Sequence, residues 1–117
     1  MCIRDRFRHN YLDGVDVERS DPRISPLLAD DLAGLPPALV LVGGFDPMCD
    51  EVRAYADALR AAGVVVDYRE FGSLVHGFAN FFSLGGDSAA ATAEMISAVR
   101  AHLSYGASAP ALREVQQ

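Results

Sequence analysis

The stretch that decides the fold is Leu41-Val42-Gly43-Gly44-Phe45-Asp46-Pro47-Met48-Cys49-Asp50-Glu51. It closes an apolar run over residues 38–42 that shows no alternation, the pattern of a strand buried on both faces of a parallel sheet. Two glycines and an aspartate follow the run, directly before a segment with helical periodicity. The sequence therefore predicts a strand, a tight turn that presents Asp46, and a helix.

The segments that follow predict a βαβ unit. A helix is expected over residues 47–62, with Gly63 as its C-terminal stop, because apolar residues recur at helical spacing. Its apolar positions are Val52, Tyr55, Ala56 and Leu59. A second strand is expected over residues 64–71, where apolar and polar residues alternate. Such alternation indicates one partly solvated face and suits an edge strand.

His76 follows the second strand as Asp46 follows the first. A right-handed crossover makes the two strands parallel, so both residues lie at the carboxyl ends where such sheets bind ligands. A histidine base needs a carboxylate at its Nδ1–H. We therefore expect an acid–base pair. The alternatives left open are that Asp46 caps the helix ahead of Pro47 and that His76 is a surface loop residue.

The remaining segments indicate less. The polar residues 1–14 predict a helix end with Gly14 just beyond it, and the proline-rich stretch 15–37 predicts a long loop. An aromatic cluster is expected after His76, and a last helix over residues 88–103. The cluster consists of Phe78, Phe81 and Phe82.

Composition narrows the class of protein. The 117 residues fit one domain, half of them are apolar, and the net charge of −6 argues against nucleic acid or an anionic membrane as partner. No apolar run has the length of a membrane span, and no secretory leader is recognised. Cys2 and Cys49 form neither a disulfide framework nor a metal site, so no metal or cofactor and a cytoplasmic setting are expected.

Four stretches resemble the carboxyl-terminal third of the α/β-hydrolase fold, and most closely the hormone-sensitive-lipase-like esterases. They are residues 20–29, 34–40, 45–51 and 76–78, and the resemblance covers residues 7–103. It implies that Asp46 is the triad acid and His76 the triad base of a serine carboxylic ester hydrolase, with a small acyl ester as substrate. The order of acid before histidine agrees. Phe78 would help to wall the substrate site, or else it belongs to the core.

The nucleophile of that family is missing. Neither its Gly-x-Ser-x-Gly elbow nor its His-Gly-Gly-Gly oxyanion-hole stretch occurs in the sequence. Residues 86–90, Gly-Asp-Ser-Ala-Ala, resemble the elbow, but they follow the histidine, end in alanine, and have no strand before them. Asp87 or Ser88 is expected instead to be the N-cap of the last helix. The chain is therefore predicted to be inactive alone.

The fold class expected is α/β, a C-terminal fragment of an α/β-hydrolase fold with two parallel strands and flanking helices. Residues 1–6 are interpreted as a non-native leader, 7–105 as the hydrolase part, and 106–117 as a flexible tail. The alternatives are a small non-enzymatic α/β binding module, or a hydrolase-fold protein with another nucleophile. A homodimer through the edge strand is left open.

Overall fold

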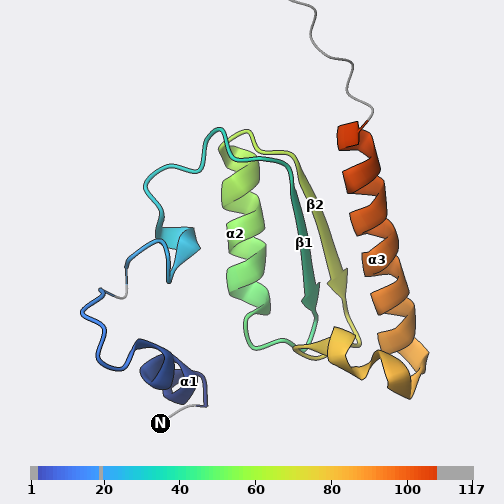
Figure 1. The fold of residues 1–117 in the computed structure, drawn as a ribbon, viewed down its shortest axis with the longest axis horizontal. Helices are drawn as coiled ribbons and strands as arrows, with labels where there is room; N and C mark the ends of the chain where they lie inside the picture. Colours follow the sequence, from blue (N-terminus) through green and yellow to red (C-terminus); the bar gives the residue numbers. More distant parts are fainter. Residues whose placement is uncertain (1–2, 19, 108–117) are drawn as a thin grey trace, which may run out of the picture.

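A two-stranded parallel sheet lies between two helices in the computed structural model, which describes residues 3–18 and 20–107 (Figure 1). Strand β1 (Ala38–Gly43) pairs with β2 (Val66–Phe71) from Ala38↔Val66 to Gly43↔Phe71. Helix α2 (Cys49–Ala61) covers one face of the sheet and α3 (Gly86–Ala107) covers the other. The predicted α/β class with two parallel strands and flanking helices is confirmed.

Helix α2 connects the strands and faces the sheet with its apolar stripe, since Ala56 and Leu59 are buried. It begins later than predicted: Pro47 lies in the turn before it and Met48 is its N-cap. Gly63 ends it as expected, with a φ of 83° that favours glycine and an N–H that donates to the carbonyl of Arg60. The crossover therefore follows the predicted order with shifted helix ends.

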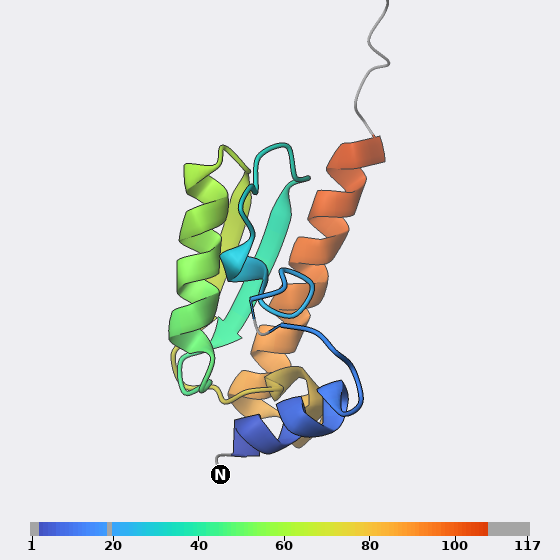
Figure 2. The same ribbon diagram turned by 90° about the vertical axis from the view of Figure 1, so that its left-hand side faces the viewer.

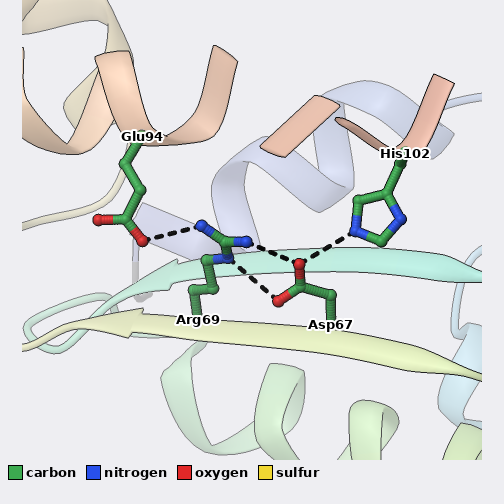
Figure 3. A network of polar contacts seen from close by, with 4 residues as sticks. All are labelled: Asp67, Arg69, Glu94 and His102. Atoms are coloured by element: carbon green, nitrogen blue, oxygen red, sulfur yellow. Dashed lines mark hydrogen bonds and ion pairs between the residues drawn. The ribbon is translucent and has the colours of Figure 1, made fainter. Parts of the chain in front are cut away.

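The polar face of β2 packs under α3 (Figure 3). Arg69 contacts Asp67 at 2.8 Å and Glu94 of α3 at 3.0 Å, and Nε2 of His102 lies 3.0 Å from Asp67. Arg69 first, and His102 second, lower the pKa of Asp67 to about 2. The face predicted to be partly solvated is thus half-buried, and the Arg69–Glu94 ion pair and the His102–Asp67 hydrogen bond hold α3 on it.

A small apolar core lies at the carboxyl end of β2. Leu74, Phe78 and Ala91 of α3 are buried together, with Phe71 packed against them. The rings of Phe71 and Phe78 meet edge to face, with centroids 5.1 Å apart. Phe78 begins the 3₁₀ helix η2 (Phe78–Leu84), whereas the other two phenylalanines of the expected cluster, Phe81 and Phe82, are exposed.

The last helix is longer than predicted, because it starts at Gly86 and runs to Ala107. The predicted N-cap is wrong: Asp87 and Ser88 lie in the first turn of the helix, and Gly85 and Gly86, with φ of 78° and 60°, make the sharp entry. Residues 106 and 107 of the predicted tail end this helix, and 108–117 lie outside the described residues.

The amino-terminal segment lies on the viewer's side of the molecule in Figure 2, where its loop crosses in front of the sheet and its helix lies below the sheet, in front of η2. It contains α1 (Ile3–Leu12), which ends before Gly14 as predicted, and the short 3₁₀ helix η1 (Pro26–Leu28). Residues 3–6 of the predicted leader belong to α1, and residues 1–2, with Cys2, lie outside the described part of the chain. The domain boundaries stay predictions.

Strand β1 has an open edge, since β2 is its one partner among the described residues. Its first four residues are half-buried and only Val42 and Gly43 are buried. In residues 3–18 and 20–107, no helix has the length and apolar character needed to cross a bilayer. A homodimer through the free edge of β2 stays a prediction.

Candidate active site

The turns that follow β1 and β2 lie against each other. The N–H of Gly44 donates to the carbonyl of Phe71 at 2.8 Å, and the N–H of Phe45 donates to the carbonyl of Leu74 at 2.9 Å. The first bond continues the parallel ladder beyond β1, and the second joins the two loops. Backbone contacts alone therefore fix how the Asp46 turn faces the His76 loop, which we define as residues 72–77.

Two glycines allow this close approach. A Cβ on Gly43 would lie 2.5 Å from the carbonyl oxygen of Leu74, and one on Gly44 would lie 2.6 Å from that of Gly72. Backbone atoms cannot move aside as the end of a flexible side chain can. The glycines at 43 and 44 are thus needed because the second loop occupies the space of their side chains.

Asp46 and His76 are in direct contact, with Oδ2 of the carboxylate 2.7 Å from Nδ1 of the imidazole. The other oxygen, Oδ1, accepts a hydrogen bond from the N–H of Met48 at 2.8 Å. Asp46 therefore stabilises the turn and contacts His76 at once, through different oxygens. Its alternative role as helix cap is corrected to a turn role, since Met48 is the N-cap of α2.

The two side chains differ in exposure. The Asp46 side chain is 9% exposed, whereas that of His76 is 68% exposed. A carboxylate only accepts, so the hydrogen bond requires the proton of a neutral imidazole to be on Nδ1, which leaves Nε2 with its lone pair. Among residues 3–18 and 20–107, no group is hydrogen-bonded to Nε2. The imidazole is thus arranged to accept a proton from a group in front of the site.

Phe78 lies directly beyond the site. Gly77 adopts a φ of 72° as the N-cap of η2, so the chain turns inward after His76. Phe78 is then buried against Phe71 and Leu74. Its packing role is observed, and contact with a substrate stays a prediction.

Cys49 and Ser88 both carry side-chain groups that can act as nucleophiles. Cys49 is buried at the start of α2, as expected for a small apolar residue, and its burial raises the pKa of the thiol. Ser88 lies in the first turn of α3, where its carbonyl accepts the hydroxyl of Thr92. Neither side chain is hydrogen-bonded to His76 in the described residues. In the described part of the chain, Asp46 and His76 are thus hydrogen-bonded to each other, and no serine or cysteine side chain is hydrogen-bonded to the imidazole.

One hydrogen bond beside the site, between Ser73 and Asp87, could not be predicted from any pattern in the sequence. The Ser73 hydroxyl donates to Oδ2 of Asp87 at 2.7 Å, across 14 residues. Sequence periodicity relates residues of one element, and these two lie in a loop and in a helix. Within the described residues, no group of three or more His, Cys, Asp or Glu side chains could hold a metal ion.

A sequence model of the α/β-hydrolase fold matches residues 3–80, a range that includes both Asp46 and His76. The chain belongs to the α/β-hydrolase fold family. The family recognised from the sequence motifs is thereby confirmed.

Carboxylic ester hydrolase LipN of Mycobacterium tuberculosis is 62% identical over 100 residues, which are 86% of this chain and 27% of that protein. Carboxylesterase NlhH of the same species is 37% identical over 102 residues, which are 84% and 31% of the two chains.

Solved hydrolase structures agree with the fold. The hyperthermophilic esterase from Pyrobaculum calidifontis superposes with a TM-score of 0.65 at 32% identity, over 71% of this chain and 26% of that one. The carboxylesterase EstE1, cloned from a metagenomic library, gives 0.60 at 39% identity, over 68% and 26%. The chain spans 27% and 31% of the lengths of the two curated relatives named above, and these relatives are ester hydrolases.

Proposed function

We propose that Asp46 and His76 are the acid and base of a Ser-Asp-His triad in a carboxylic ester hydrolase that acts on small acyl esters. The observation that carries the proposal is the 2.7 Å contact between Oδ2 and Nδ1, with a shielded carboxylate and an exposed ring. Membership of a family whose matched relatives are carboxylic ester hydrolases supports the reaction class. The serine hydroxyl and the oxyanion-hole donors come from outside these 117 residues.

In the first half of the reaction, Nε2 of His76 removes the proton of the serine hydroxyl while its oxygen attacks the ester carbonyl. The imidazolium formed is stabilised by the carboxylate of Asp46 at Nδ1. It then gives the Nε2 proton to the departing alcohol, so the carbon–oxygen bond breaks and an acyl-enzyme remains.

In the second half, water takes the place of the alcohol. Nε2 removes a proton from the water, whose oxygen attacks the acyl-enzyme carbonyl, and the same proton returns to the serine. The carboxylic acid leaves and His76 is neutral again. Asp46 keeps the proton on Nδ1 throughout, so the lone pair on Nε2 is available at the start of each half.

A chimeric enzyme tests this assignment. Residues 7–105 of this chain replace the matching segment of the Mycobacterium tuberculosis relative that is 62% identical, so the acid and the base come from this chain and the serine from the relative. Hydrolysis of p-nitrophenyl acetate and butyrate is then measured. We expect an active enzyme, and we expect His76→Ala to lower kcat by about 10⁴-fold or more, as loss of a triad base does.

Asp46→Asn is a sharper test because of Met48. The Met48 N–H needs an acceptor, so the asparagine oxygen faces Met48 and its amide NH₂ faces His76. An NH₂ group donates, which makes Nδ1 the acceptor and puts the imidazole proton on Nε2. Nε2 then carries the proton and has no lone pair with which to accept one from the serine. We therefore expect kcat to fall by about 10⁴-fold with little change in fold.

The matched control is Asp30→Asn, which removes an equal charge at an exposed loop position. It should leave kcat and KM within twofold of the chimeric enzyme. Full activity of the Asp46→Asn or the His76→Ala chimera would contradict the proposal, and the acid and base would then have to be sought elsewhere.

A further inference from the structure

Several backbone and core contacts fix the His76 loop, whereas the His76 side chain makes one hydrogen bond among the described residues. On the β1 side the loop is bonded through the carbonyls of Phe71 and Leu74. On the core side Leu74 is buried against Phe78. His76 is exposed, and its contact with Asp46 is its one side-chain hydrogen bond among the described residues. The position of the imidazole therefore depends on how firmly the rest of the loop is fixed.

The third side of the loop faces α3, and there the Ser73 hydroxyl donates to the Asp87 carboxylate at 2.7 Å. This length is normal for a hydroxyl donating to a carboxylate, and bonds with a charged acceptor are the stronger class. Asp87 lies in the first turn of α3, where the helix dipole favours negative charge. The bond joins the beginning of the loop, three residues before the histidine, to a helix end.

The helix at the far end of this bond is itself fixed. Glu94 of α3 forms an ion pair with Arg69 of β2, and His102 of α3 is hydrogen-bonded to Asp67 of β2 (Figure 3). Ala91, one turn after Asp87, is buried in the core beside Leu74. Ser73 is thus hydrogen-bonded to α3, which is fixed on the sheet over much of its length. The bond can therefore restrain the loop, because the helix itself is held in place.

We propose that Ser73 and Asp87 are positioning residues, which hold the loop so that His76 keeps its contact with Asp46 and its orientation toward the nucleophile. The inference rests on the proposed function of His76 as the base. Neither residue is hydrogen-bonded to the imidazole, so their effect is on its placement. Placement counts because a displacement of about 1 Å at a reacting group can cost about 100-fold in rate.

The test uses the chimeric enzyme with Ser73→Ala, Asp87→Ala and both together. Loss of one hydrogen bond to a charged group predicts a fall in kcat of about tenfold for each single variant, with KM within twofold. The double variant should fall no further, because the two residues act through one bond. Ser73→Thr keeps the hydroxyl and should restore kcat.

A second measurement reports on the imidazole directly. The downfield proton resonance of the His76 Nδ1–H is recorded by NMR, together with its exchange with water. We expect faster exchange and a broader line in Ser73→Ala than in Ser97→Ala, a matched control at an exposed position of α3. Thermal unfolding midpoints of these two variants should agree, which separates placement of the histidine from general stability.

The outcomes separate the two proposals. If His76→Ala abolishes hydrolysis while Ser73→Ala behaves as Ser97→Ala does, the proposed function stands and the positioning role is wrong. Additive effects of Ser73→Ala and Asp87→Ala, or a change in KM alone, would equally overturn the positioning role. If His76→Ala leaves hydrolysis intact, the proposed function itself fails.

Discussion

Gly43 lies so close to Leu74 that an added Cβ would come within 2.5 Å of the Leu74 carbonyl oxygen and 2.9 Å of its carbonyl carbon. This carbonyl also accepts the N–H of Phe45, one residue before Asp46. The residue that ends β1 therefore sets the distance between the two loops that carry Asp46 and His76. A change there acts on the pair without touching either side chain.

Gly43→Ala is expected to push the His76 loop away from Asp46. In the chimeric enzyme kcat should fall by about 100-fold or more, the order found when a reacting group moves by about 1 Å. The control is Gly72→Ala, since a Cβ on Gly72 would meet no atom within 4 Å. Equal activities of the two alanine variants would show that the close approach at Gly43 does not determine catalysis.

The 117-residue chain alone is expected to hydrolyse no ester above the rate of free imidazole, because a base without a nucleophile and an oxyanion hole lacks the main contributors to rate. Release of p-nitrophenol from the acetate ester measures this. Ser88, in the first turn of α3, should not react with a fluorophosphonate probe. Stoichiometric labelling of Ser88, found by peptide mass spectrometry, would assign the nucleophile to this chain after all.

Phe78→Ala tests whether Phe78 is a core residue or a substrate contact. Phe78 is 7% exposed and packs edge to face on Phe71, so the substitution should cost about 3–5 kcal/mol of unfolding free energy. In the chimeric enzyme this should lower the thermal midpoint by roughly 10 °C. Phe82→Ala, at a side chain that is 59% exposed, is the control. A raised KM with an unchanged midpoint would instead indicate contact with substrate.

Asp67 predicts a pH dependence of stability. Arg69 and His102 lower its pKa to about 2, below the value of about 3.9 for an unfolded chain. Its carboxylate therefore stabilises the folded state above about pH 4, and this contribution is lost as the pH falls through about 2. Asp67→Asn should lower the urea midpoint at pH 7, and the difference from the unsubstituted protein should shrink between about pH 4 and pH 2.

The comparison that checks this is the chimeric enzyme with and without Asp67→Asn, unfolded in urea at pH 7, 4 and 2.5. Asp30→Asn is again the control, because Asp30 is exposed in a loop. A difference between the Asp67 variant and the unsubstituted protein that stays constant down to pH 2.5 would mean that the ion pairs under α3 contribute nothing.

The elements that the sequence predicted well are those with a strong local pattern. The unbroken apolar run gave β1, and helical spacing with Gly63 at its end gave α2. The start of α3 was misplaced, because Asp87 is a common N-cap residue type while two glycines with positive φ make the turn. N-cap propensity is a property of the residue type, whereas the backbone conformation before the helix decides which residue is the N-cap.

The contact between Asp46 and His76 was foreseen because parallel strands bring their carboxyl ends to one rim. The contacts that stabilise this arrangement were not predicted. They join residues far apart in the chain: Gly43 with Leu74, Ser73 with Asp87, and Arg69 with Glu94. Such contacts depend on how helices, strands and loops pack together, and the periodicity of the sequence carries no information about this packing.

Asp46 and His76 lie 30 residues apart, in the turns that follow β1 and β2, and the backbone hydrogen bonds that join these turns involve residues of the same segment. Both Gly44–Phe71 and Phe45–Leu74 fall between residues 43 and 76. A recombination event between two related hydrolase genes that exchanges residues 43–87 together therefore transfers the two side chains with these backbone hydrogen bonds and with the Ser73–Asp87 bond. A crossover inside this segment combines loops from different parents, so residues 43–87 should be inherited as one block.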